Sequence, residues 1–238
     1  MPDTTSLKNG LAEWNIGLSG RQTEQFLSYY EMLTEKNKVM NLTAITDYEE
    51  VVHKHFIDSL ALALSSVFEK RGKLIDVGTG AGFPGIPLKI AFPEIEVVLL
   101  DSLNKRVGFL NEVIEQLGLT GIRAVHGRAE DAAREAEYRE QFDFCVSRAV
   151  ANLSTLAEYG MPFVKQGGYF VPYKSGKVVE EMKEAENAVK LLSGRIKDTI
   201  SFVLPGTDME RTLILIQKTA PIHKKYPRKA GTPQKEPL

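Results

Sequence analysis

The stretch Leu74–Leu88 places a carboxylate and a cluster of glycines between an apolar run and a pattern typical of a helix, in the order LIDVGTGAGFPGIPL. Glycines at such a point let a ligand approach bare backbone, and the first amides of the helix can bind an anionic group. Pro87 suits the first turn of this helix, and Pro93 marks its end. The stretch therefore predicts a ligand-binding loop.

The residue types in this loop narrow the choice of ligand. No lysine followed by serine or threonine occurs in it, which argues against a triphosphate-binding P-loop. Gly80–Gly85 matches G-x-G-x-x-G, and Asp101 lies near the distance expected of a ribose-binding acid, as in dinucleotide sites. Asp76 argues against a dinucleotide, because a carboxylate ~5 Å from a pyrophosphate costs about 3 kcal/mol per charge pair.

S-adenosylmethionine fits this loop better, because it carries an ammonium and a sulfonium as well as a carboxylate. Its carboxylate can then lie on the amides of the loop and helix, with Gly80 and Gly82 exposing the backbone. Asp76 can pair with the ammonium, directly or through water, and Asp101 can accept hydrogen bonds from both ribose hydroxyls. The alternative for Asp76 is a carboxylate that caps nearby loop amides.

Two later strand ends are expected at the same crevice, because ligands of open α/β sheets lie outside the carboxyl ends of the strands. Ala129 and Glu130 follow the third strand and can offer an amide and a carboxylate to adenine, although acids also commonly begin helices. Arg148, in Ser147–Val150, follows the fourth strand and is assigned to the site, with an ordinary ion pair as the alternative.

The elements that must position these residues fall into a helical part followed by an α/β part. Residues 1–70 read as helical, with a capping box at Ser19–Gln22 and a second cap at Asp47–Glu50. The apolar residues expected on the faces of these two helices are Phe26, Tyr30 and Leu33, and then Val52, Phe56, Leu60 and Leu64.

From residue 71 to 218, short apolar runs alternate with helical patterns, which predicts a doubly wound, mostly parallel sheet. Helices are expected over Asn104–Leu117 and Lys177–Leu192. The turn-rich Pro205–Asp208 predicts a closing hairpin whose last strand runs antiparallel. The expected strands are Lys73–Val77, Glu96–Leu100, Arg123–His126, Phe142–Ser147, Tyr169–Pro172, Thr199–Leu204 and Thr212–Ile216.

Composition points to a protein of the cytoplasm with one unusual end. Cys145 is the only cysteine and lies in an apolar run, so a buried thiol in a reducing compartment is expected. Neither an export signal nor a membrane span is recognisable. The net charge is -1, yet residues 218–238 hold six Lys/Arg against one acid. Residues 219–238 therefore form a basic tail on an acidic body.

Together these motifs resemble the glucose-inhibited division protein B family of bacteria. The resemblance covers most of the chain and is most specific in the phenylalanine-proline extension of the glycine loop and in Lys225–Pro233. It implies a Rossmann-like class I methyltransferase fold and transfer of a methyl group from S-adenosylmethionine to N7 of a guanine in small-subunit (16S) ribosomal RNA. The cofactor contacts that it implies are Gly78, Phe83, Ala129, Glu130 and Arg148.

In this interpretation the basic tail contacts RNA. Lys224, Lys225, Arg228 and Lys229 can meet phosphates while Tyr226 stacks on a base, with Lys174 and Lys177 adding charge at the rim of the cleft. Ribosomal RNA or a small-subunit precursor is the expected partner, rather than DNA or a membrane. Removing residues 219–238 should then abolish RNA methylation while leaving cofactor binding intact.

Three alternatives stay open at this point: a methyltransferase acting on a small molecule or protein, a nicotinamide-dependent oxidoreductase, and a cofactor-binding assembly factor without catalysis. Methylation of guanine N7 removes no proton, so no general base is assigned. A metal site at His53, His55 and Asp58 is not expected, because helical positions two apart point to different sides. The roles of Asn41, His55 and Asp58 are left open, and the simplest expectation for Asn41 and His55–Ser59 is that they tie the helical segment to the main domain.

Overall fold

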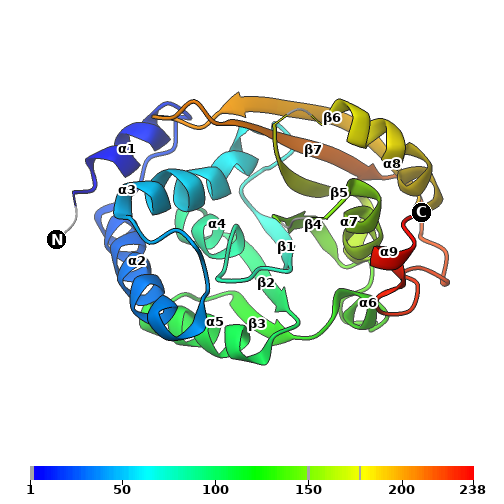
Figure 1. The fold of residues 1–238 in the computed structure, drawn as a ribbon, viewed down its shortest axis with the longest axis horizontal. Coiled ribbons are helices and arrows are strands. Elements are labelled where there is room, and N and C mark those ends of the chain that lie inside the picture. Colours follow the sequence, from blue (N-terminus) through cyan, green and yellow to red (C-terminus); the bar gives the residue numbers. More distant parts are fainter. Residues whose placement is uncertain (1–2, 149–150, 177) are drawn as a thin grey trace.

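The protein is built around one twisted sheet with the strand order β3-β2-β1-β4-β5-β7-β6 (Figure 1). The structure, a computed structural model, describes residues 3–148, 151–176 and 178–238. Neighbouring strands from β3 to β5 pair in parallel, and β7 runs antiparallel to both β5 and β6, as predicted. The strands are β1 Gly72–Val77, β2 Ile95–Asp101, β3 Ile122–His126, β4 Phe142–Ser147, β5 Val164–Ser175, β6 Gly194–Val203 and β7 Glu210–Lys218.

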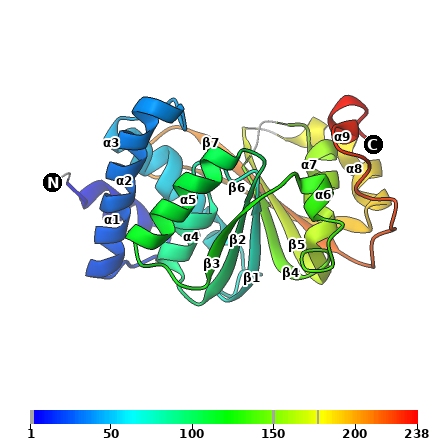
Figure 2. The same cartoon turned by 90° about the horizontal axis from the view of Figure 1, so that it is seen from below.

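Helices cover both faces of the sheet, which gives three layers (Figure 2). One face carries α1 Thr5–Ala12, α2 Gly20–Met40, α3 Tyr48–Val51, α4 Gly85–Ala91 and α5 Asn104–Gln116, with the helical turns η1 Val52–Ile57 and η2 Leu60–Leu64. The other face carries α6 Ala129–Ala132, α7 Leu153–Gly160, η3 Met161–Phe163, α8 Val179–Leu191 and α9 Thr232–Lys235.

The capping box that begins α2 is present as predicted. Ser19 Oγ accepts from the backbone N–H of Gln22, and the Gln22 side chain accepts from the N–H of Ser19. The buried face of α2 differs by one position from the prediction, because Tyr29 is fully buried while Tyr30 is half-buried. Tyr29 Oη donates to the carbonyl of Ala81 in the glycine loop, a partner that helical periodicity alone does not reveal.

The second predicted helix begins at its expected cap, where Asp47 accepts from the N–H of Glu50. It does not continue as one regular helix, since α3 passes into the π-helical turn η1 and then the 3₁₀ turn η2. Val52, Phe56 and Leu60 are buried nonetheless. The change in winding turns His55 and Asp58 of this segment toward the end of β4, as described below.

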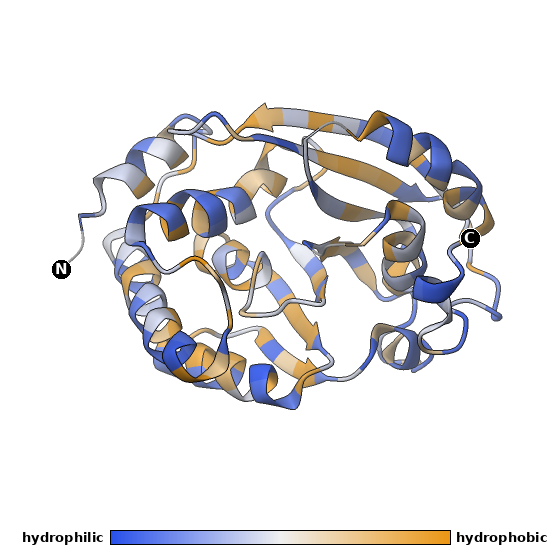
Figure 3. Ribbon diagram, viewed as in Figure 1, coloured by the Kyte–Doolittle hydropathy of each residue, from blue (hydrophilic) through white to orange (hydrophobic). Residues whose placement is uncertain are grey.

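Two apolar clusters fill the spaces on either side of the sheet. One joins helical residues such as Phe26 and Phe56 to strand residues such as Leu99, and the other contains Cys145. Figure 3 shows hydrophobic residues along the strands and hydrophilic residues on outer helices such as α8. Cys145 is a buried free thiol, as predicted. Within the described ranges, none of the helices has the length and apolar character needed to cross a membrane.

Candidate functional site

The glycine loop between β1 and α4 is held by its own backbone. Gly78 and Thr79 both donate to the carbonyl of Leu100 at the end of β2, with N···O distances of 2.9 and 3.2 Å. Gly78 and Gly80 adopt positive φ angles of 72° and 64°, and a Cβ atom added at either would meet open space. Gly78 therefore presents unshielded backbone to the crevice described below, as a ligand loop requires, whereas Gly80 does not line it.

Gly82 and Gly85 serve packing instead. A Cβ atom at Gly82 would lie 2.5 Å from Cδ1 of Ile86 and 2.7 Å from Oη of Tyr29. At Gly85 it would lie 2.3 Å from Cδ2 of Leu99. The absence of a side chain at Gly82 lets α2 and α4 approach the loop, and at Gly85 it lets α4 approach β2. The cofactor contact expected of Gly82 stays a prediction.

Asp76 caps the loop, which is the alternative that the sequence left open. Its Oδ2 accepts from Oγ1 of Thr79 at 2.6 Å and from the N–H of Gly85 at 2.8 Å. The residue is 0% exposed, its Oδ1 has no hydrogen-bond partner, and burial raises its pKa to about 6. The first amide of α4 is thus taken by Asp76, which corrects the prediction that the start of this helix receives an anionic ligand group.

Asp101 is likewise engaged with backbone. Its Oδ2 accepts from the N–H of Gly80 and its Oδ1 from the N–H of Leu103, both at 2.9 Å, and Arg106 lies 3.5 Å from Oδ2. With 2% exposure, the carboxylate fixes the loop against the end of β2. Its contact with ribose hydroxyls stays a prediction.

A crevice of about 370 Å³ opens at the carboxyl ends of β1, β2 and β4. This volume falls within the range typical of small-molecule sites. Of the predicted cofactor residues, Gly78, Ala129 and Glu130 line it. Apolar and aromatic walls come from residues that include Val77, Leu100, Leu156 and Tyr159. Glu130 is the buried carboxylate of this crevice.

The C-terminal segment, residues 219–238, closes one side of the same crevice. Gly231 and Gln234 line it, and the N–H of Gly231 donates to Oε1 of Glu130 at 2.8 Å. Arg228 forms a two-pronged ion pair with Glu158 of α7, which is 0% exposed. The segment is therefore a wall of the crevice, and its removal is not expected to leave cofactor binding intact.

Two predicted RNA contacts in this segment need correction. Tyr226 is 4% exposed and packs in the apolar cluster around Cys145, so its ring is not free to stack on a base. Arg228 is committed to Glu158. Lys224, Lys225 and Lys229 are exposed, as phosphate contacts require. Lys174 bonds the carbonyl of Ala151 and pairs with Glu181 at 2.6 Å, while Lys177 lies outside the described residues, as do positions 149–150.

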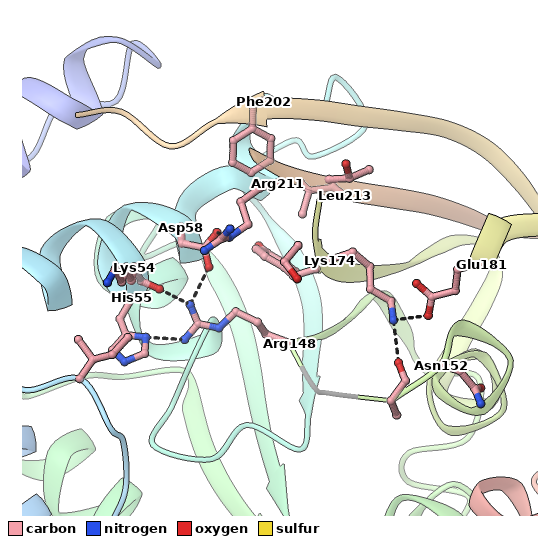
Figure 4. Close-up of a pocket in the computed structure, with 15 residues that line it drawn as sticks. Lys54, His55, Asp58, Arg148, Asn152, Lys174, Glu181, Phe202, Arg211 and Leu213 are labelled. Atoms are coloured by element: carbon pink, nitrogen blue, oxygen red, sulfur yellow. Dashed lines mark hydrogen bonds and ion pairs between the residues drawn. The ribbon is translucent and has the colours of Figure 1, made fainter. Parts of the chain in front are cut away.

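Arg148 joins the end of β4 to the segment around η1 (Figure 4). Its Nη1 donates to Oδ2 of Asp58 and to the carbonyl of Lys54, both at 2.9 Å, and its Nη2 lies 3.0 Å from Nδ1 of His55. The guanidinium also lies over the ring of Phe83, 5.1 Å from its centre. The predicted tie between the helical segment and the main domain thus runs through His55 and Asp58.

His55 is held as a neutral imidazole. Burial and the neighbouring Arg148 lower its pKa to about 3. Because Arg148 can only donate, Nδ1 must accept, which leaves the proton on Nε2, 2.9 Å from Oγ1 of Thr43. The imidazole stacks on Phe83 with 4.5 Å between ring centres. His55 therefore has no free lone pair with which to remove a proton from a ligand.

A second cavity, the polar cavity, occupies about 740 Å³ beside this cluster. Its walls include four cations, Lys54, Arg148, Lys174 and Arg211, and two carboxylates, Asp58 and Glu181. Tyr173 and Phe202 add aromatic surface. Ala151 lines both this cavity and the crevice, so the two spaces adjoin at the end of β4. Among the described residues, no cluster of His, Cys, Asp and Glu is suited to hold a metal ion.

Sequence reasoning missed Gly231, Gln234 and the site role of Asp58. The sequence does contain one signal for the wall formed by the C-terminal segment, which is Glu158 in α7. An acidic residue among apolar neighbours is expected to be buried and then requires a cationic partner. Which of the basic residues of the tail supplies it depends on the docking of two distant segments. Arg148 forms the ion pair that the sequence left open as the alternative and lines the polar cavity, so its predicted contact with the cofactor stays a prediction.

Comparison with known proteins finds similarity over nearly the whole chain. The family model described as GidB, rRNA small subunit methyltransferase G, matches residues 22–212. A ribosomal RNA small subunit methyltransferase G of Lachnoclostridium phytofermentans is 56% identical over 238 residues, covering 100% of this chain and 98% of that protein. One from Alkaliphilus metalliredigens is 49% identical over 232 residues, covering 98% of this chain and 97% of that protein.

Solved structures resemble the fold at much lower identity. A fibrillarin pre-rRNA processing protein of Methanococcus jannaschii gives a TM-score of 0.52 at 15% identity, covering 66% of this chain and 70% of that one. The M. jannaschii TYW2 protein in complex with AdoMet gives 0.51 at 14% identity, covering 64% and 72%. These similarities confirm the Rossmann-like class I methyltransferase fold.

Proposed function

This chain belongs to the GidB family, rRNA small subunit methyltransferase G, and on that premise we propose that it transfers a methyl group from S-adenosylmethionine to N7 of a guanine in small-subunit (16S) ribosomal RNA. The single observation that carries the proposal is the adjoining of two unlike spaces at the end of β4. One is a small crevice beside a glycine loop, and the other is a larger cavity rich in cations.

The residues of the crevice fit S-adenosylmethionine. Gly78 leaves open space where other residues carry a side chain, which suits a ligand lying against the loop. Glu130 provides a buried carboxylate, and the apolar walls suit the adenosine. When bound, this cofactor supplies a methyl group on a positively charged sulfur.

The reaction requires little of the protein beyond positioning the cofactor and the guanine. Guanine N7 has a free lone pair and loses no proton on methylation, so the reaction requires no general base. The neutral, fully engaged His55 agrees with this, since no other imidazole lines either cavity among the described residues. Alignment of the two reactants in a confined site can contribute ~7–11 kcal/mol of barrier lowering.

The polar cavity supports a nucleic-acid substrate. Four cations against two carboxylates leave a positive balance around a space large enough for a base, which suits a nucleotide with its phosphates. N7 lies on the Hoogsteen edge, so the guanine must be unpaired or flipped out of its stack. The exposed Lys224, Lys225 and Lys229 add phosphate contacts near the crevice. With such a substrate, we expect the protein to act in the cytoplasm.

The test incubates the protein with labelled methyl donor and with small-subunit RNA, or whole subunits, that lack the modification. Digestion and mass mapping should find the label on one guanosine, as the N7-methyl product. Label on protein or on a small metabolite would support a methyltransferase with another substrate. Binding of NAD in place of the methyl donor would support an oxidoreductase, and binding of the donor without transfer to any RNA would support a non-catalytic assembly factor.

A further inference from the structure

Asp58 has an unused hydrogen-bond acceptor at the wall of the polar cavity. The residue is 4% exposed, and its Oδ2 accepts from Arg148 at 2.9 Å. Its Oδ1 is buried and accepts no hydrogen bond, although Nε of Arg211 lies 3.5 Å away as an ion-pair neighbour (Figure 4). A buried acceptor without a donor is unfavourable, so this oxygen has capacity for one more hydrogen bond, which Arg211 does not supply in this arrangement.

Among the described residues, Asp76 is the other carboxylate with a buried oxygen that lacks a hydrogen-bond partner, and its surroundings differ. Asp76 is fully buried and lines neither the crevice nor the polar cavity. Asp58 lines the polar cavity directly. Of the two, Asp58 is therefore the one that borders a cavity.

We propose that Asp58 binds the Watson–Crick edge of a guanine held in the polar cavity and selects guanine over other bases. This inference rests on the proposed function. Guanine presents two donors on that edge, N1–H and the N2 amine, and an ionised carboxylate accepts such a pair. Adenine presents an acceptor at N1, which would face the carboxylate with like polarity. The Watson–Crick edge lies opposite N7, so this contact leaves the reacting atom free.

The surroundings of Asp58 fix the carboxylate and can hold the rest of a nucleotide. Arg148 is itself held by His55 and the carbonyl of Lys54, so it orients Asp58 Oδ2 from a rigid cluster. Phe202 lines the same wall and is only half-buried, so part of its ring is open to the cavity. Aromatic surface of this kind can stack on a flipped base.

The test uses the RNA substrate with its mapped target guanosine replaced by inosine, which lacks the N2 amine. Because the wild-type protein then forms one hydrogen bond fewer to a charged acceptor, its kcat/KM should fall about ten- to a hundredfold. In Asp58→Ala the guanosine reaction slows, and the ratio between guanosine and inosine should fall to near one. Glu181→Ala is the matched control, since Glu181 is the other carboxylate of the cavity and pairs with Lys174. It should keep the full ratio.

The ratio separates base recognition from a merely structural role of the ion pair with Arg148. Loss of that pair alone would slow both substrates equally and leave the ratio unchanged in Asp58→Ala, which would overturn the inference. Equal rates for guanosine and inosine with the wild-type protein would overturn it as well. Asp58→Asn, which keeps the side-chain shape, provides the same comparison if the alanine variant does not fold, and S-adenosylhomocysteine titration checks that the crevice is intact.

A third substrate keeps the inference distinct from the proposed function. With 7-deazaguanosine at the target position, N7 is absent while the Watson–Crick edge is unchanged. The substrate should bind but accept no methyl group. Methylation of this substrate would contradict N7 as the target and leave recognition by Asp58 to be judged on the inosine ratio alone.

Discussion

The glycine loop and the C-terminal segment face each other across the crevice, and they are held in opposite ways. The loop is fixed by neighbours close in sequence or on the next strand, such as Asp76, Thr79 and Leu100. The C-terminal segment is fixed by side chains far away in the chain, because Arg228 pairs with Glu158 and Gly231 bonds Glu130. One wall of the site is thus a local property of the sequence, and the other exists only after folding.

This difference predicts different vulnerabilities. A change in the loop should act through backbone strain or through direct contact with the cofactor. A change in the anchor of the C-terminal segment should loosen this wall in part, because the ion pair of Arg228 acts beside the buried packing of Tyr226 and the hydrogen bonds from Arg139. Four experiments test whether the two walls differ in this way, and they are given in order of decreasing expected effect.

Arg228→Ala should have the largest effect. It leaves the carboxylate of Glu158, which is 0% exposed, without its cation, and a broken buried pair costs about 3–5 kcal/mol. We expect the C-terminal segment to loosen where it meets α7, with weaker S-adenosylhomocysteine binding by calorimetry and a lower free energy of unfolding in urea. Lys229→Ala, one position along and exposed, is the control and should stay within about 0.5 kcal/mol. Unchanged cofactor affinity in Arg228→Ala would show that the segment is no wall of the crevice.

Asp76→Asn tests the loop through pH. The pKa of Asp76 is about 6 in the folded protein against 3.8 in the unfolded chain, so the folded state holds this proton more tightly. The stabilisation that results is fully present below pH 3.8 and is lost as the pH rises through 6, with a total of about 3 kcal/mol. The difference in unfolding free energy between Asp76→Asn and wild type should therefore shift in favour of the variant from pH 4 to pH 7. A pH-independent difference would contradict the raised pKa.

Gly82→Ala and Gly78→Ala should separate packing from ligand contact within the loop. At Gly82 the added methyl meets Ile86 and Tyr29, and overpacking of this kind costs about 1–3 kcal/mol of stability. At Gly78 the methyl meets open space, so only left-handed strain of about 1–2 kcal/mol is expected, together with weaker cofactor binding. Urea unfolding and S-adenosylhomocysteine titration of both variants provide the measurements. Equal loss of affinity in the two would argue that Gly82 also faces the cofactor.

The smallest effect is expected from the exposed face of the C-terminal segment. Replacing Lys224, Lys225 and Lys229 together by alanine should leave stability and cofactor binding unchanged. RNA binding should weaken, and the slope of log K against log salt should fall by about 0.7 for each phosphate of single-stranded RNA that the variant no longer neutralises. Filter binding across a salt series measures this slope. An unchanged slope would place the RNA phosphates elsewhere, for example on the cations of the polar cavity.

Residues a few positions apart are enough to specify the strand segments, the caps and the glycine loop, so these could be predicted from the sequence. The short apolar runs of the strands, the capping box at Ser19 and the hairpin signal at Pro205–Asp208 all express such short-range chemistry. The family resemblance added the reaction and the cofactor. These parts of the prediction agree with the structure and with the relatives.

Which charged side chains are buried, and which partner each of them has, depends on the tertiary fold. Arg228 reads as a phosphate contact in the sequence, yet it pairs with Glu158, 70 residues away. Asp58 reads as a tether, yet it also leaves an unpaired acceptor in a cavity wall. An ion pair of this kind forms because both partners lose water together, and that loss depends on the packing of distant segments. No local pattern of residues specifies it.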